Sequence, residues 1–120
     1  MIRDGEKLLL SFDIGSVPWK YVESDDSIED EMTEAQGIMR ADRQVVYVNR
    51  SETPPEGYEY VFFHEAGHAV FFTTGVKEAL KQITGFEGDK CTQLEEFLMS
   101  NLMHAMYDTL KRNGWLKIPL

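Results

Sequence analysis

The 120-residue sequence predicts a single α+β domain in which two N-terminal β-hairpins form a small antiparallel or mixed sheet packed on helices. Two features of the chain lead to this prediction. Up to residue 50, short β-prone segments flank turn residues, whereas from Tyr58 onward apolar residues recur at helical spacing. Apolar residues make up 42% of the chain, which is enough for one modest core. We therefore expect residues 1–120 to form one domain.

The first predicted hairpin consists of an apolar segment, Lys7–Asp13, and a partly alternating segment, Val17–Glu23. Gly15 lies in the turn between them. Proline has no N–H for a strand ladder, so Pro18 makes the start of the second strand an edge or irregular position. After this hairpin, Ser27–Thr33 is predicted to form a short acidic helix.

The second predicted hairpin consists of Gln36–Ala41 and Gln44–Asn49, with Asp42 and Arg43 in the turn. Four consecutive residues of its second segment, at positions 45–48, are strongly β-prone. The segment that follows, Ser51–Gly57, contains two prolines and a glycine and is predicted to be a loop.

Helical spacing of apolar residues begins at Tyr58 and continues to Thr73, and Gly75 is positioned to cap the C-terminus of this helix. The helix is apolar on most sides, which predicts that it is buried. A second, shorter helix is predicted for Val76–Thr84, with Gly85 at its end.

The longest helical pattern covers Thr92–Asn113. Thr92, with Glu95 three residues later, forms the pattern of a capping box, in which the two side chains bind backbone N–H groups of the first turn. An apolar stripe on this helix is predicted to face the core, and it consists of Leu94, Leu98, Leu102, Ala105, Met106 and Leu110.

Residues 64–68, within the first helix, read His-Glu-Ala-Gly-His, which is the HExxH pattern of zinc hydrolases. On a helix, His64 and His68 lie on the same face about 6 Å apart, so both imidazoles can bind one tetrahedral zinc ion at about 2.0–2.1 Å. Glu65 projects about 100° away from His64 and is not a ligand in this arrangement. It lies beside the open coordination position, where it can take a proton from water.

A catalytic zinc ion requires a third protein ligand from elsewhere in the chain. The candidates that follow the motif are Cys91, Glu95, Glu96, His104 and Asp108. Helical phase places Glu95 on the stripe that faces the core, so Glu95 is the preferred ligand. The capping box competes for the same side chain, and Glu96 becomes the ligand if the cap engages Glu95.

The remaining candidates have other interpretations. His104 lies nine residues beyond Glu95, about 180° round the helix and ~13 Å along its axis, so it is interpreted as a solvent-facing or second-site histidine. Cys91 is interpreted as a small buried apolar residue. Tyr58, Tyr60 and Tyr107 have hydroxyls suited to an oxyanion, but aromatic residues at helical spacing favour the core.

Composition and charge narrow the class of partner. The net charge of −9 argues against duplex DNA or RNA as the main partner, because phosphate binding needs a basic surface. With Cys91 as its one cysteine, the chain has no internal disulfide, which indicates a reducing, cytoplasmic setting. No segment approaches the ~18 apolar residues needed to span a membrane.

The assembled pattern resembles the smallest zincins, the gluzincin-like metallopeptidases in which two histidines and one glutamate bind zinc. The matching segments are Gln44–Asn49 as the strand before the site, Tyr60–Val70 as the active helix, and residues 95–98 at the start of the distal helix. The likeness is greatest with small phage- and prophage-encoded proteins related to the ImmA/IrrE metallopeptidase group. The chain lacks the EAN-type tripeptide that follows the glutamate in larger members. The resemblance implies a zincin-like fold and hydrolysis of peptide bonds.

These observations together predict a cytoplasmic zinc metallopeptidase that acts on a peptide or protein substrate. Zn²⁺ is expected on His64, His68 and Glu95, with Glu65 as the general base. The strand Gln44–Asn49 is expected to pair with an extended substrate if it lies at the sheet edge. Because so small a domain has little surface beyond its cleft, specificity is expected to depend on a partner protein or on self-association.

Two alternatives remain at this point. One is a zinc hydrolase that uses the same ligands on other amides or esters. The other is a metal-stabilised phage accessory protein that binds a partner without turnover. Glu65 favours an enzyme, because a structural zinc site is normally closed by four protein ligands and has no need of a base.

Overall fold

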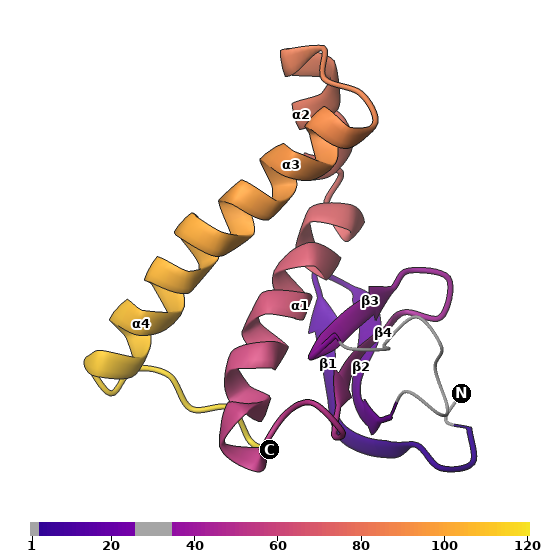
Figure 1. Ribbon diagram of the computed structural model, residues 1–120, viewed down its shortest axis with the longest axis vertical. Helices are drawn as coiled ribbons and strands as arrows, with labels where there is room; N and C mark the ends of the chain where they lie inside the picture. The colour runs from indigo at the N-terminus through magenta and orange to yellow at the C-terminus, as the bar shows by residue number, and fades with distance from the viewer. Residues whose placement is uncertain (1–2, 26–34) are drawn as a thin grey trace.

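Two hairpins joined by a parallel pair of strands make up the sheet (Figure 1). The computed structural model of the protein describes residues 3–25 and 35–120. The strands are β1 (Lys7–Ile14), β2 (Val17–Ser24), β3 (Gly37–Arg40) and β4 (Val45–Asn49), in the spatial order β1-β2-β4-β3. Both predicted hairpins are confirmed, and the sheet is mixed because β2 and β4 run parallel. The predicted helix Ser27–Thr33 lies outside the described residues.

Strand β4 lies in the interior of the sheet, so its backbone cannot pair with a substrate. β4 pairs with β2 on one side and with β3 on the other, and all its residues are buried. The condition for Gln44–Asn49 to pair with a substrate, a place at the sheet edge, is therefore not met. β3 is the edge strand on this side.

β2 is also an interior strand, although it contains Pro18 near its start. Pro18 lies opposite Asp13 of β1, and the pairing of β2 with β4 begins only at Lys20. The missing N–H of the proline therefore leaves no gap in the β2–β4 ladder.

Helix α1 (Tyr58–Thr73) lies across β3 and β4, and the main core forms between this helix and the sheet (Figure 1). The ring of Phe62 packs against those of Phe12 and Tyr21, at centroid distances of 5.0 and 4.9 Å. The Tyr21 hydroxyl donates a hydrogen bond to the carbonyl of Tyr58, at 2.6 Å. The buried residues of this core are Trp19, Tyr21, Val46, Val48, Val61 and Ala69.

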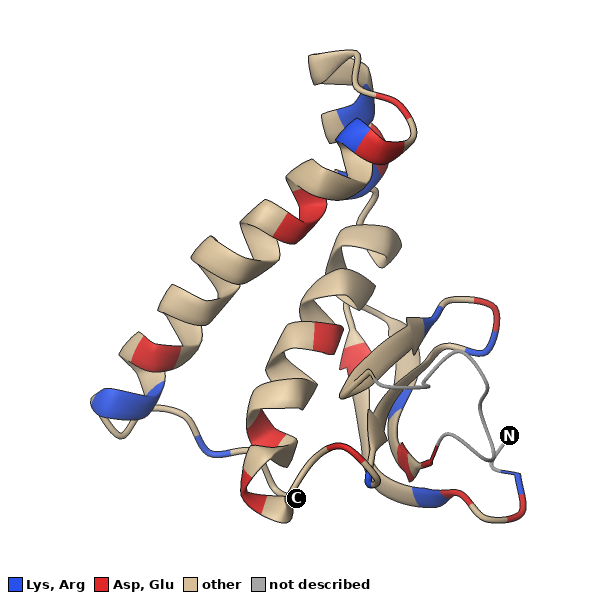
Figure 2. Ribbon diagram, in the orientation of Figure 1, with Lys and Arg blue, Asp and Glu red and all other residues tan. Residues whose placement is uncertain are grey.

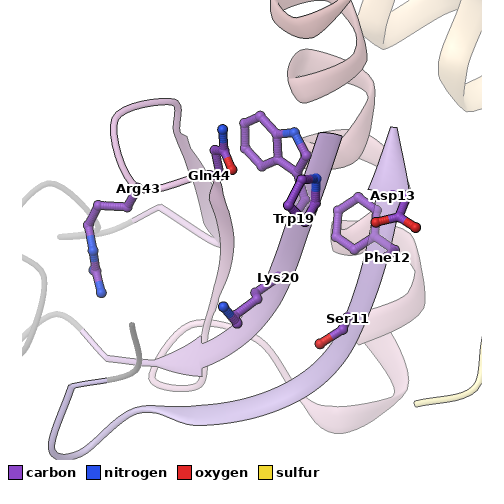
Figure 3. Close-up of a pocket in the computed structure, with 8 residues that line it drawn as sticks. Ser11, Phe12, Asp13, Trp19, Lys20, Arg43 and Gln44 are labelled. Atoms are coloured by element: carbon purple, nitrogen blue, oxygen red, sulfur yellow. The ribbon is translucent and has the colours of Figure 1, made fainter. Parts of the chain in front are cut away.

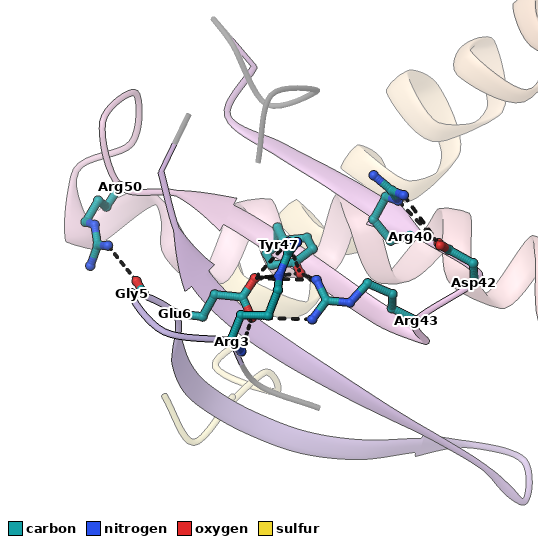
Figure 4. A network of polar contacts seen from close by, with 8 residues as sticks. All are labelled: Arg3, Gly5, Glu6, Arg40, Asp42, Arg43, Tyr47 and Arg50. Carbon is teal, nitrogen blue, oxygen red and sulfur yellow. Dashed lines mark hydrogen bonds and ion pairs between the residues drawn. The ribbon is translucent and has the colours of Figure 1, made fainter. Parts of the chain in front are cut away.

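The opposite face of the sheet carries a second, smaller cluster and a polar network (Figure 4). The Glu6 carboxylate is fully buried, pairs with Arg3 and Arg43 at 3.2 and 3.4 Å, and accepts a hydrogen bond of 2.8 Å from the Tyr47 hydroxyl. Two guanidinium groups thus compensate one buried carboxylate, as burial of a charge requires. The network ties the residues before β1 to β4.

The first two helices begin and end where the sequence predicts. A 3₁₀ turn, η2 (Pro55–Gly57), leads into α1, and α2 (Val76–Thr84) follows. Gly75 and Gly85 end the two helices with left-handed backbone, at φ values of 79° and 72°, which glycine adopts without strain. Among the described residues, no helix is long and apolar enough to cross a membrane.

The long C-terminal helix consists of α3 (Asp89–Leu98), a π-helical turn η3 (Met99–Met103) and α4 (His104–Arg112), which run on continuously in Figure 1. It begins three residues earlier than Thr92, and the predicted capping box is wrong. Gly88 stands at the N-cap position, and the Thr92 hydroxyl donates back to the Gly88 carbonyl at 3.3 Å. Glu95 is therefore free of a capping role.

The π turn also changes which side chains face α1. A π turn holds one extra residue, which rotates all later residues by about 100° relative to a continuous α-helix. Met99 is fully buried, whereas Leu102 and Met106 are 50% and 44% exposed. The prediction that Leu102 and Met106 face the core is wrong for this reason.

Candidate metal centre

His64 and His68 lie on one face of α1, as the HExxH spacing predicts, with ring centroids 5.1 Å apart. The two imidazoles and Glu65 border a cavity of about 430 Å³ between the edge strand β3 and helix α3. The other residues that line this cavity are Gly37, Ile38, Met39, Glu95 and Glu96. Figure 2 shows an acidic position midway along α1 and acidic positions on α3.

Both candidate glutamates of α3 reach His68, but they contact different nitrogens. Glu95 Oε2 lies 2.7 Å from Nδ1 of His68, and Glu96 Oε1 lies 3.2 Å from Nε2. One ligand atom each from His64, His68 and Glu96 all lie within 4.8 Å of one another. The structure thus groups Glu96, the alternative third ligand, with the two histidines.

Glu95, the ligand preferred from the sequence, occupies the other side of His68. Its side chain is 12% exposed, and its Oε1 lies 3.7 Å from Nζ of Lys77. A carboxylate that accepts a hydrogen bond from the second nitrogen of a metal-binding imidazole fixes the orientation and tautomer of that ring. Glu95 lies in this position relative to Nδ1 of His68.

The donor set fits a zinc ion. Two imidazole nitrogens and one carboxylate oxygen are ligands that zinc prefers, and a catalytic site leaves the fourth position open. Ligands at about 2.0–2.1 Å from a tetrahedral ion lie about 3.3 Å apart. The span of 4.8 Å or less among the atoms of His64, His68 and Glu96 is therefore within reach of side-chain rotation.

Glu65 lies beside this donor set, with its Oε2 at 4.0 Å from Nε2 of His64. Burial, with a smaller contribution from the nearby Glu96, raises the pKa of Glu65 to about 8. Burial also lowers the pKa of His64, and His68 adds to this effect. A lowered pKa keeps the His64 imidazole neutral, which is the form that binds a metal.

His104 is part of the site, contrary to its interpretation as a distant residue. Its Nε2 lies 3.3 Å from Nδ1 of His64, and its ring is in contact with Tyr60. The π turn immediately before His104 rotates it by about 100° relative to the predicted phase. Apolar spacing does not reveal a π turn, so the sequence carried no signal for this contact.

Two other candidates do not join the cluster. Cys91 is buried at the start of α3, as predicted, and Asp108 is exposed on α4. Tyr107 donates a hydrogen bond of 3.1 Å to Glu59 and so ties α4 to the start of α1.

A second cavity, of about 280 Å³, adjoins the first and is also lined by Gly37, His64 and Glu65. Tyr60 and His104 lie on its other walls. Gly37 is essential to this arrangement, because a Cβ there would lie 2.7 Å from Cγ1 of Val61 and 3.0 Å from Cγ of Glu65, both on α1. The edge strand β3 therefore passes close to Glu65, and both cavities border this contact.

A separate cavity of about 310 Å³ lies at the β1–β2 turn end of the sheet (Figure 3). Trp19, Lys20 and Arg43 are among its lining residues, and it contains no histidine. It shares no residue with the two cavities at the histidines.

Comparison with known proteins found no match to a protein-family model, to a curated protein or to a solved structure. The resemblance to zincins remains a prediction from the sequence motifs, and the side-chain geometry is the remaining support for a function.

Proposed function

We propose that this protein is a zinc-dependent metallopeptidase in which His64, His68 and Glu96 bind the metal and Glu65 is the general base. The observation that carries the proposal is the convergence of Glu96 from α3 on the two histidines of α1, with Glu65 beside them. This choice replaces Glu95 by Glu96 as the third ligand and gives Glu95 the role of orienting His68.

Zn²⁺ held by these ligands would lower the pKa of a water molecule to about 7 and polarise the carbonyl of a substrate. Glu65 accepts the proton of that water as its oxygen attacks the peptide carbonyl carbon. The same carboxyl group then donates the proton to the departing amine. In the metal-free protein burial raises the pKa of Glu65 to about 8, and the charge of a bound Zn²⁺ would favour the ionised carboxylate that accepts the proton.

The substrate is proposed to bind as an extended peptide along β3. This strand is the sheet edge beside the site, and Gly37, Ile38 and Met39 line the cavity next to the histidines. An edge strand has unpaired backbone groups on its outer side, which can pair with a peptide by strand addition. Such pairing would lay the peptide across Glu65.

The test compares the zinc-loaded protein with its Glu65→Gln variant on a mixed peptide library. The variant should keep its zinc, because Glu65 is not a ligand, and should lose hydrolysis by about 10²–10⁴-fold. Glu78→Gln, an exposed substitution on α2, is the matched control and should cleave as well as the parent.

Cleavage that survives Glu65→Gln would refute the role of the base. Zinc bound by the parent without cleavage of any peptide would refute the peptidase and support a metal-stabilised binding protein instead.

A further inference from the structure

One nitrogen of His64 faces a residue to which the proposed mechanism gives no role. Nδ1 of His64 lies 3.3 Å from Nε2 of His104, the first residue of α4. The hydroxyl of Tyr60 lies 2.5 Å from the same Nε2 and 3.1 Å from Nδ1 of the His104 ring. Tyr60 and His64 are four residues apart on α1, so the three side chains form one continuous group between the two helices.

Contacts on the far side of Tyr60 hold this group in place. The ring of Tyr107, on α4, packs edge-on against that of Tyr60 at 5.5 Å. The Tyr107 hydroxyl donates to Glu59, and Nζ of Lys111 lies 2.6 Å from the same carboxylate. The start of α4 is thus fixed against the start of α1, which limits how far the His104 ring can move.

An imidazole that binds a metal through one nitrogen carries a proton on the other, and this N–H needs an acceptor. For His68 the group at the second nitrogen is Glu95, at 2.7 Å. For His64 it is Nε2 of His104. With Nε2 as acceptor, the proton of a neutral His104 lies on Nδ1, and the Tyr60 hydroxyl, which is 2.5 Å from Nε2 and 3.1 Å from Nδ1, contacts the ring at the edge between the two nitrogens.

We propose that His104 is a positioning residue, which holds the His64 ring and its tautomer ready for the metal, and that Tyr60 in turn orients His104. The inference rests on the proposed function in one respect, the binding of a metal by His64. The two metal-binding histidines then have different partners, a carboxylate for His68 and an imidazole for His64.

The experiment measures Zn²⁺ affinity by competition with a chromophoric chelator and the absorption spectrum of the Co²⁺-loaded protein. His104→Ala should lose about 10–100-fold in affinity, the usual effect of removing a partner of a metal ligand, with an altered Co²⁺ spectrum. His104→Gln places an amide near the Nε2 position and should recover most of the affinity. Tyr60→Phe should fall between His104→Ala and the parent.

Tyr58→Phe is the matched control. It removes a tyrosine hydroxyl from the same helix, but that hydroxyl contacts Glu23 and not the histidines, so both the zinc affinity and the Co²⁺ spectrum should equal those of the parent. Circular dichroism establishes that each variant is folded. If His104→Ala fails to fold, Tyr60→Phe and His104→Gln decide the question.

Zinc affinity and Co²⁺ spectrum that are unchanged in all the His104 and Tyr60 variants would overturn the inference and leave the peptidase proposal intact. The expected losses of affinity in a protein that cleaves no peptide would support the inference and refute the peptidase. A parent protein that binds no zinc would overturn both.

Discussion

The substitution Glu65→Gln should make the metal-free protein more stable at neutral and alkaline pH. Glu65 is buried on α1, and its side chain is 12% exposed. Burial raises its pKa from 4.5 in the unfolded chain to about 8 in the folded protein. Glutamine has nearly the same shape as the protonated acid but never carries the charge, so it removes the cost of a buried carboxylate.

The sign follows from proton binding. Between pH 4.5 and about 8, the folded protein binds more protons at Glu65 than the unfolded chain does, so stability falls as the pH rises. Each tenfold change in proton affinity is worth about 1.4 kcal/mol. Burial of Glu65 therefore costs the folded state about 3 kcal/mol at pH 7, where the group takes up a proton on folding, and about 5 kcal/mol above pH 8.5, where the carboxylate is mostly charged.

Urea unfolding, followed by circular dichroism in the presence of a chelator, measures this difference. The parent and Glu65→Gln should agree within about 1 kcal/mol at pH 5, and the variant should be several kcal/mol more stable at pH 8.5. Glu78→Gln, exposed on α2, controls for the loss of one negative charge. A gap between parent and Glu65→Gln that does not widen with pH would refute the raised pKa of Glu65 in the metal-free protein.

Three further substitutions test the geometry of the site and of β3. Glu95→Gln should lower zinc affinity about 10–100-fold as the loss of a partner of His68, and Glu96→Gln should lower it further because it removes a ligand; the reverse order in a competition titration would make Glu95 the ligand. Gly37→Ala should destabilise the protein by about 1–3 kcal/mol, because the added Cβ would lie 2.6 Å from the Tyr47 carbonyl oxygen on β4 and 2.7 Å from Cγ1 of Val61 on α1. An unchanged urea midpoint for Gly37→Ala would contradict the close approach of β3 to α1.

The elements that could be predicted from the sequence are those with local signals. Turn residues flank the strands of each hairpin, and glycines at positions 75 and 85 mark the ends of α1 and α2. The parallel pairing of β2 with β4 has no local signal, because the two strands are far apart in the chain. For that reason the sequence did not show that β3, rather than β4, forms the edge beside the histidines.

The candidate site was predictable to the level of the motif and the neighbouring pair of glutamates. Helical phase separates Glu95 from Glu96 by about 100°, yet both side chains are long enough to reach His68. Only their contacts show that each approaches a different nitrogen. His104 could not be placed at all, since its position depends on the π turn before it.

Gly67 occupies one of the two variable positions of the HExxH motif, and its lack of a side chain has a structural function there. A Cβ at Gly67 would lie 2.9 Å from Sδ of Met99 and 3.2 Å from Cε of Met103, so the π turn rests directly on the backbone of α1 at this point. Glu96 precedes that contact by less than one turn. A larger side chain at position 67 would therefore press on Met99 and Met103, where the helix with both histidines packs against the helix with the proposed third ligand. The spacing of the proposed metal ligands thus depends on a residue that has no side chain.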